Sequence, residues 1–302
     1  GSESVAIGDG ADSQGIGSVA MGHNAKAIGV NTTAIGAGTK ADGNDATALG
    51  NNAQAIGKYS TAVGNLAKAN ELYSTALGYE ATAEGLRSTA IGMKALVKGA
   101  GSTDSFAIGN GTQVTGSYNV ALGQEIEVNG SYSSAVGYMA KAKSSGSVAI
   151  GTEAETSGAN SAALGNHAKA SGSESLALGN AAEASGRASN AIGWTAKATA
   201  QNATAIGSGA TADANNATAV GDEAKANQAF SNALGYKAQA NSTGSTAIGP
   251  WAETSGVDSA ALGNSAKASG SESLALGKRA KTDSMAEQAL AVGVDATAEA
   301  PR

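Results

Sequence analysis

Residues 147–151 read Ser-Val-Ala-Ile-Gly, and variants of this five-residue block recur along the whole 302-residue chain. The closing glycines stand 14 residues apart in two long runs, 8–92 and 109–277, and a last one follows at Gly293. In all 21 repeats alanine stands two positions before this glycine, and Ile, Leu, Val or Met stands one position before it. A fixed period of this kind indicates a repeat architecture in which each repeat packs on its neighbours.

The repeat pattern favours β-structure over helix, although 14 residues would also make two heptads. A glycine costs about 1 kcal/mol inside a helix, and most repeats carry two. The apolar residues alternate locally and do not follow a heptad seam. Each repeat is therefore predicted to form two strands of about five residues, joined by turns into one flattened coil. Successive coils would stack at the strand spacing of about 4.8 Å, giving an all-β, parallel β-roll (β-solenoid).

Composition narrows the possible interior and the possible partners. Aromatic residues make up only 4% of the chain, and most apolar residues are alanine, so the lumen of each coil must be narrow. A net charge of −6 argues against nucleic-acid binding through phosphate contacts. The absence of cysteine excludes a disulfide scaffold and thiolate metal sites. No apolar run is long enough for a membrane-spanning helix.

The alternation within each strand assigns alanines to the lumen and the residue before the repeat glycine to the outside. This outer row is apolar in every repeat, and a monomer rarely exposes so long an apolar stripe. We therefore predict that other copies of the chain cover it around a symmetry axis. Lumen and stripe could be exchanged in detail, but oligomerisation is predicted with either assignment. The predicted interface stripe includes Ile7, Met21, Ile35, Leu49, Ile150, Leu164 and Leu178.

The blocks at 147–151 (Ser-Val-Ala-Ile-Gly) and 18–22 (Ser-Val-Ala-Met-Gly), each followed by an Ala-x-Ala half-repeat on a period of 14, resemble a known family. They are similar to the head repeats of trimeric autotransporter adhesins, the YadA-like family of Gram-negative bacteria. The resemblance covers nearly the whole chain. It implies a left-handed parallel β-roll, a homotrimer and a place in a cell-surface fibre that a C-terminal element anchors in the outer membrane.

The resemblance also implies what the protein does. Heads of this family bind extracellular matrix proteins, host cells or abiotic surfaces. The matching motif is structural, so it transfers no ligand-binding residues to this chain. We interpret residues 1–302 as a single excised head, with the stalk and the membrane anchor lying outside it.

Two stretches interrupt the period. Residues 98–104 hold three extra positions, and residues 278–288 hold two. The two repeats after the first interruption are the poorest in alanine, with Val114 and Val128 at expected lumen positions. We interpret the second interruption as the approach to a further element.

The aromatic residues occupy particular positions in the repeat and are candidates for ligand contact. Tyr118 and Tyr132 stand nine residues after a repeat glycine, as do Tyr59 and Tyr73, so stacking of the coils is predicted to place the two members of each pair side by side. Tyr138 and Trp194 directly follow one, and exposed Tyr and Trp are good contact residues. The alternative is that stacked rings only stabilise adjacent turns or seal the seam between chains.

Lysines form a second candidate row in the shorter half of the repeat, beginning with Lys26 and Lys40. A basic stripe could attract acidic glycans or anionic surfaces. The row also holds Glu155 between Lys141 and Lys169, and alternating charges on adjacent strands are mildly stabilising. This alternation favours a solvated structural ladder.

No catalytic, metal or cofactor site is predicted. His23 and His167 are isolated in the sequence, and neither has the partners that nucleophilic catalysis or zinc binding requires. A threonine row from Thr33 to Thr89 raises an ice-binding hypothesis, but its neighbouring row is large and apolar. Two hypotheses therefore remain: an adhesin head that binds through a repeated surface, and a passive spacer that projects another binding domain.

Overall fold

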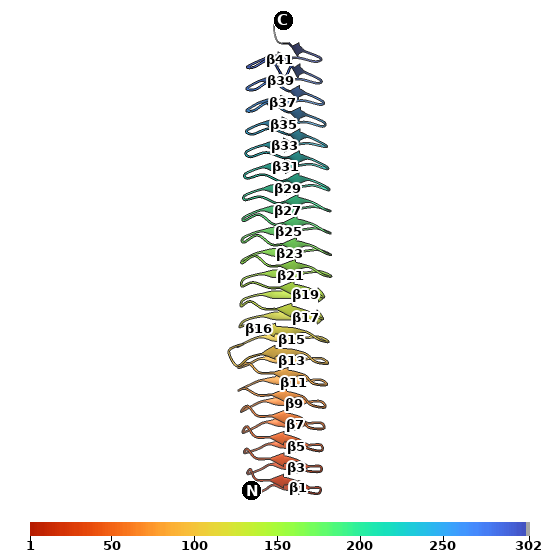
Figure 1. The fold of residues 1–302 in the computed structure, drawn as a ribbon. Helices are drawn as coiled ribbons and strands as arrows, with labels where there is room; N and C mark the ends of the chain where they lie inside the picture. Colours follow the sequence, from red (N-terminus) through yellow and green to blue (C-terminus); the bar gives the residue numbers. More distant parts are fainter. Residues whose placement is uncertain (300–302) are drawn as a thin grey trace. The chain divides into compact units, whose positions relative to one another are not determined.

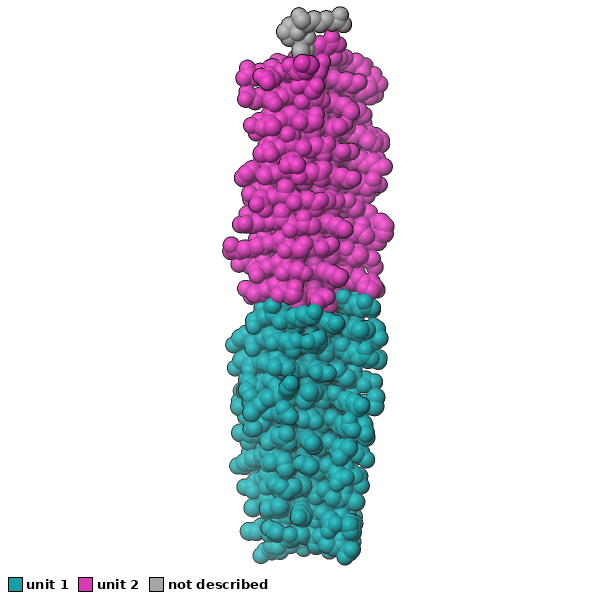
Figure 2. Space-filling model, in the orientation of Figure 1, with its two compact units in different colours: residues 1–153 teal, residues 154–302 magenta. Residues whose placement is uncertain are grey.

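The computed structural model describes residues 1–299, and every regular element in that range is a β-strand. The chain divides into two compact units, Gly1–Glu153 and Ala154–Arg302, which Figure 2 shows in teal and magenta. Each unit by itself is a stack of coils, and each coil contributes one strand to each of two parallel sheets (Figure 1). No described segment forms a helix with the length and hydropathy of a membrane span.

The strands that end just before the repeat glycine carry odd numbers. In unit 1 they are β1 (Val5–Ile7), β3 (Val19–Met21), β5 (Thr33–Ile35), β7 (Thr47–Leu49), β9 (Thr61–Val63), β11 (Thr75–Leu77), β13 (Thr89–Ile91), β15 (Phe106–Ile108), β17 (Val120–Gln124), β19 (Ser134–Tyr138) and β21 (Val148–Ile150). In unit 2 they are β23 (Ala162–Leu164), β25 (Leu176–Leu178), β27 (Asn190–Ile192), β29 (Thr204–Ile206), β31 (Thr218–Val220), β33 (Asn232–Leu234), β35 (Thr246–Ile248), β37 (Ala260–Leu262), β39 (Leu274–Leu276) and β41 (Leu290–Val292).

The strands of the shorter half carry even numbers. In unit 1 they are β2 (Asp12–Ser13), β4 (Lys26–Ala27), β6 (Lys40–Ala41), β8 (Gln54–Ala55), β10 (Lys68–Ala69), β12 (Thr82–Ala83), β14 (Leu96–Lys98), β16 (Gln113–Thr115), β18 (Glu127–Val128) and β20 (Lys141–Ala142). In unit 2 they are β22 (Glu155–Thr156), β24 (Lys169–Ala170), β26 (Glu183–Ala184), β28 (Lys197–Ala198), β30 (Thr211–Ala212), β32 (Lys225–Ala226), β34 (Gln239–Ala240), β36 (Glu253–Thr254), β38 (Lys267–Ala268), β40 (Lys281–Thr282) and β42 (Thr297–Ala298).

Within each unit, a strand pairs in parallel with the equivalent strand of the next coil, so identical repeat positions lie side by side. Val19, for example, pairs with Thr33 and Ala20 with Ala34. This register confirms a β-solenoid of 14-residue coils. The predicted strand length of about five residues was wrong, because most strands have two or three residues. The remaining positions of each coil form its two corners, where the chain leaves the extended conformation.

The lumen is lined by alanine, as predicted. Ala177 of β25 and both Ala182 and Ala184 on the facing side are fully buried. The predicted stripe lies on the outside of the coils: Ile150 is 40% exposed, and Leu164 is half-buried. The other exposed members are Ile7, Met21, Leu49 and Leu178, and Ile35 is half-buried. The structure thus separates the small lumen row from the large outer row, while its burial by other chains stays a prediction.

The repeat glycine is required by the close approach of adjacent coils. All repeat glycines have φ between 124° and 141°, a region that L-residues rarely adopt. A Cβ on Gly179 would lie 2.4 Å from the carbonyl oxygen of Gly193 in the next coil. Any side chain at this position would therefore force the coils apart.

Serine in the five-residue block closes the other corner. The Ser175 hydroxyl is buried and donates a hydrogen bond to the Gly172 carbonyl oxygen at 2.6 Å. Ser189 and Ser273 make the equivalent bonds to Gly186 and Gly270 at 2.7 and 2.6 Å. The Gly186 carbonyl also accepts from the Ser189 backbone N–H at 3.2 Å, so the hydroxyl adds a second hydrogen bond at this turn.

Candidate binding surface

One corner of unit 1 carries a row of six side chains on successive coils, five positions before each repeat glycine. We call this row the corner ladder. All six residues adopt the left-handed conformation, with φ between 51° and 60°. The corner ladder consists of Tyr59, Tyr73, Arg87, Asp104, Tyr118 and Tyr132.

The left-handed conformation is unusual for bulky residues and costs roughly 1–2 kcal/mol for each one. Here it turns the backbone N–H of the corner residue toward the preceding coil. The Tyr59 N–H donates to the Asn44 carbonyl oxygen at 2.9 Å, and the Tyr73 N–H donates to that of Lys58 at 3.0 Å. The bonds between coils therefore fix the backbone, and the side chain at this corner remains free to project outward.

The tyrosines of the corner ladder form two stacked pairs. The ring centroids of Tyr59 and Tyr73 lie 4.9 Å apart, with 6° between the ring planes. Tyr118 and Tyr132 are also 4.9 Å apart, with 12° between the planes. Every ring is exposed, and Tyr132 is 69% exposed. The predicted proximity within each pair is confirmed, and the stacking arises because equivalent positions of adjacent coils lie side by side.

An arginine–aspartate pair joins the two tyrosine pairs. Arg87 Nε donates to Asp104 Oδ1 at 2.7 Å, and Arg87 Nη2 donates to Oδ2 at 2.6 Å. Hydrogen bonding to Arg87 lowers the pKa of the Asp104 carboxyl, and the same bond raises the pKa of Arg87. The negative charge of ionised Tyr118 would also raise the pKa of Arg87. The corner ladder thus presents planar groups continuously over six coils.

The insertion at 98–104 lies beside the corner ladder and is tied to it by hydrogen bonds. It connects β14 to β15, where a loop projects beyond the other turns (Figure 1). The Gly99 N–H donates to the Glu84 carboxylate at 2.8 Å, and the Ser117 hydroxyl donates to the Gly101 carbonyl at 2.7 Å. The extra residues therefore place Asp104 in register with Arg87.

The lumen is enlarged next to the insertion. Val97, Val114, Ile126 and Val128 are fully buried or nearly so, at positions where other coils hold alanine. Buried Asn119 replaces the usual serine, and its side-chain amide donates to the Gly130 carbonyl at 2.6 Å. The nearby strands β17 and β19 have five residues, the longest in the described chain. Both lie in the coils that carry Tyr118 and Tyr132.

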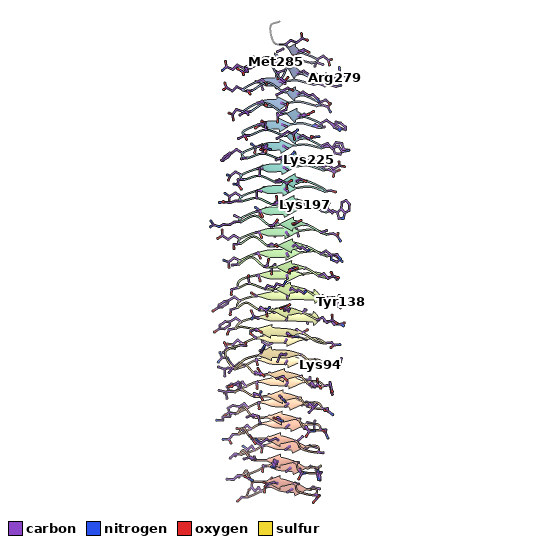
Figure 3. The ribbon with its side chains drawn as sticks, viewed as in Figure 1. Lys94, Tyr138, Lys197, Lys225, Arg279 and Met285 are labelled. Carbon is purple, nitrogen blue, oxygen red and sulfur yellow. The ribbon has the colours of Figure 1, made fainter. Side chains whose placement is uncertain are left out.

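The other aromatic candidates do not join the corner ladder. Tyr138 directly follows a repeat glycine and therefore lies at the opposite corner of its coil, where Figure 3 labels it. Trp194 occupies the equivalent corner in unit 2 and is 62% exposed. The six predicted ligand-contacting residues are thus not one site, although Tyr118 and Tyr132 are neighbours.

The lysine row lies on the sheet of even-numbered strands. Lys26 of β4 pairs with Lys40 of β6, and Lys40 Nζ lies 2.5 Å from the Asp42 carboxylate. In unit 2, Lys267 lies 2.6 Å from Glu253 of the neighbouring strand. These ion pairs agree with the interpretation of this row as a structural ladder.

Sequence reasoning missed three members of aromatic or planar clusters. Arg87 and Asp104 were not singled out, although Arg87 has the same spacing from its repeat glycine as the tyrosines. Asp104 stands five positions before Gly109, which is the spacing of the tyrosines from the repeat glycine that follows them, so this spacing could have identified it. In unit 2, Trp251 packs edge-on against Tyr236 at 5.0 Å, and it too occupies a left-handed corner.

Within residues 1–299, no group of three or more His, Asp or Glu side chains is placed to bind a metal ion. His23 Nε2 lies 3.7 Å from the Asp9 carboxylate at the surface. Shallow grooves beside the lysine row, such as one of about 380 Å³ that includes Lys169, Glu183 and Lys197, are open to solvent.

Comparison with protein families gives matches along most of the chain. The YadA head domain repeat (two copies) matches residues 1–25, 13–39, 27–53, 55–81, 69–95, 100–125, 129–154, 157–182, 184–210, 198–224, 212–231, 233–250 and 255–280. The chain belongs to the YadA head domain family. Membership gives the protein an adhesin-type role and a surface-exposed, extracellular location.

Among solved structures, this chain is similar to the collagen-binding domain of the Yersinia adhesin YadA. The identity is 25%, the match covers 56% of this chain and 69% of that chain, and the TM-score is 0.25. No curated protein sequence matches the chain. The family assignment rests on the repeated head motif, which confirms the resemblance found in the blocks at 147–151 and 18–22.

Proposed function

We propose that this chain is the head of a homotrimeric, outer-membrane-anchored adhesin that attaches cells to extracellular matrix proteins, host cells or abiotic surfaces without catalysis. The corner ladder of unit 1 carries this proposal. Tyrosine and arginine are enriched in binding hot spots, and here they project from rigid corners beside the insertion. Three copies of the ladder in one head would add avidity to each individual contact.

The outer stripe of the odd-numbered strands supports the trimer. Ile150 is 40% exposed in the single chain, and the equivalent residues of neighbouring coils are exposed or half-buried. A second and third copy would remove this apolar surface from water, which is favourable at about 25 cal/mol per Å². The left-handed roll and the single-head organisation of residues 1–302 remain predictions from the family resemblance.

Ile150→Asp tests the trimer, because the carboxylate would be buried without a partner at a cost of several kcal/mol. Light scattering of the native chain is expected to give about three times 29.0 kDa, and the variant to give a lower mass. Ile150→Leu serves as the control and should assemble normally. A folded native chain of 29.0 kDa would contradict the trimer.

Binding is tested with the purified native chain on collagens, fibronectin, laminin, glycans, host cells, polystyrene and glass. The double variant Tyr118→Asn/Tyr132→Asn removes one stacked pair, and asparagine occupies the same left-handed corner natively at Asn160 and Asn202. We expect at least a tenfold loss of binding to the preferred surface. Tyr138→Asn is the matched control at the opposite corner, where repeats also carry asparagine.

The passive spacer remains the second candidate function, and the regular coils of unit 2 favour it. A spacer would show no saturable binding to any member of the panel. Unchanged binding by Tyr118→Asn/Tyr132→Asn would reject this tyrosine pair as a contact site while leaving the adhesin role in place.

A further inference from the structure

The stacked tyrosines of unit 1 have a geometry that goes beyond a contact surface. Two exposed phenol rings on adjacent coils lie near-parallel at 4.9 Å in each pair. Both rings of a pair are anchored by hydrogen-bonded backbone, since the Tyr118 and Tyr132 N–H groups donate to the preceding coil at 2.9 Å. Neighbouring phenols that are held in place have a high effective concentration for reaction with each other.

We propose that the pairs Tyr59–Tyr73 and Tyr118–Tyr132 are sites of oxidative modification, each forming one dityrosine cross-link between adjacent coils. The oxidant is hydrogen peroxide, acting through a haem peroxidase. Because the chain has no cysteine, disulfide bonds are not available to join its coils. Within each unit, successive coils are held by hydrogen bonds and by packing, and the cross-link adds a covalent bond between them.

The reaction balances with one peroxide for each cross-link. The peroxidase removes one electron from each phenol, and each phenolic oxygen releases its proton. The two radicals couple through ring carbons ortho to the oxygens, forming one carbon–carbon bond. The hydrogen on each coupled carbon then transfers as a proton to a phenolic oxygen, which restores both aromatic rings. The pair loses two hydrogens in total, and the peroxide is reduced to two molecules of water.

The remaining tyrosines provide a comparison within the same chain. The chain has seven tyrosines, and the three outside the pairs are Tyr79, Tyr138 and Tyr236. Within residues 1–299 no stacking joins any of them to another tyrosine, and the ring against Tyr236 is that of Trp251. These three are exposed like the paired residues, so exposure alone would predict equal oxidation.

The experiment treats the full chain, at high dilution, with hydrogen peroxide and a haem peroxidase. Dityrosine fluorescence and a mass decrease of two hydrogens for each link report the reaction. Trypsin cleavage after Lys58 and Lys68 places Tyr59 and Tyr73 on separate peptides. A second digestion with a glutamate-specific protease, which cleaves after Glu125 or Glu127, separates Tyr118 from Tyr132. Each link is then identified as one joined pair of peptides.

We expect two links within each chain, formed at a rate independent of protein concentration. Tyr73→Asn should remove the first link and Tyr132→Asn the second, while Tyr138→Asn and Tyr236→Asn should remove neither. The oxidised chain should melt several degrees higher than the untreated chain, because each link closes a short loop in the unfolded state. No dityrosine, links mainly between different chains, or equal coupling through Tyr79, Tyr138 and Tyr236 would overturn the proposal.

Discussion

The coils around β14–β20 in unit 1 and the coils of unit 2 share one backbone repeat but fill it differently. In unit 2 the lumen is built from alanines such as Ala182 and Ala184, and serine closes the corner. Between β14 and β20 the lumen holds Val97, Ile126 and other large residues, and the insertion lies beside it. The coil therefore tolerates a change of lumen volume in the part of unit 1 where the outer corner carries Tyr118 and Tyr132.

This contrast shows that different positions of the repeat set the spacing of the coils and carry the variable side chains. The repeat glycine fixes the spacing of the coils, because a Cβ at that position would meet backbone of the next coil. The left-handed corner is set by backbone hydrogen bonds, so it accepts residues as different as Tyr132, Glu174 and Asn202. Chemistry can change at the corners without a change of fold.

The largest expected effect comes from the repeat glycine. Gly179→Ala places a Cβ 2.4 Å from a carbonyl oxygen of the next coil, at φ 135°. We expect a loss of about 4 kcal/mol in the free energy of unfolding, measured by urea denaturation. The control is Gly101→Ala in the insertion, where a Cβ would meet no atom within 4 Å. Equal losses of unfolding free energy in Gly179→Ala and Gly101→Ala would show that the regular coils are not more tightly spaced than the insertion.

The second effect tests the enlarged lumen. Ile126 is 1% exposed, and Ile126→Ala would leave a cavity, with an expected loss of about 3 kcal/mol in the free energy of unfolding. The reciprocal change, Ala210→Ile at the equivalent position of unit 2, overfills a lumen built for alanine and should cost about 2 kcal/mol. Urea denaturation measures both. If Ile126→Ala left the free energy of unfolding unchanged, the two regions would not differ in lumen packing.

The smallest effect concerns the pH dependence of the Arg87–Asp104 pair. Arg87 lowers the pKa of Asp104, so the pair stabilises the folded chain above the ordinary aspartate pKa. That contribution is lost as pH falls through the lowered pKa of the folded state. Arg87 is exposed and Asp104 is half-buried at the surface, so the change in melting temperature should be small and should shrink with added salt.

Carboxyl NMR titration measures this effect directly. In Arg87→Gln the Asp104 midpoint should rise toward the ordinary aspartate value. Asp295, which Arg279 holds at a lowered pKa in unit 2, should keep its midpoint in the same variant. An unchanged Asp104 midpoint would show that Arg87 does not contact the carboxylate in solution.

The sequence was sufficient for the coil, its period and its alanine lumen, because each is expressed as a repeated residue choice. It overestimated strand length, since corner backbone conformation is not visible in residues as varied as Tyr59 and Arg87. It placed Tyr118 beside Tyr132 because equal positions become neighbours in a 14-residue register. It did not show that Asp104 pairs with Arg87, although each stands five positions before a repeat glycine, because this corner holds varied polar residues in other coils.

Because equivalent positions of adjacent coils lie in parallel register, such a head can change length by whole coils. Within a unit, each coil meets its neighbours through the same residues, such as Ala20 against Ala34. Recombination between in-phase copies of the repeat would therefore add or delete whole coils while leaving every remaining contact of the same kind. Each coil gained would extend its stack by about 4.8 Å, so the length of the stack can vary in small, equal steps at constant fold.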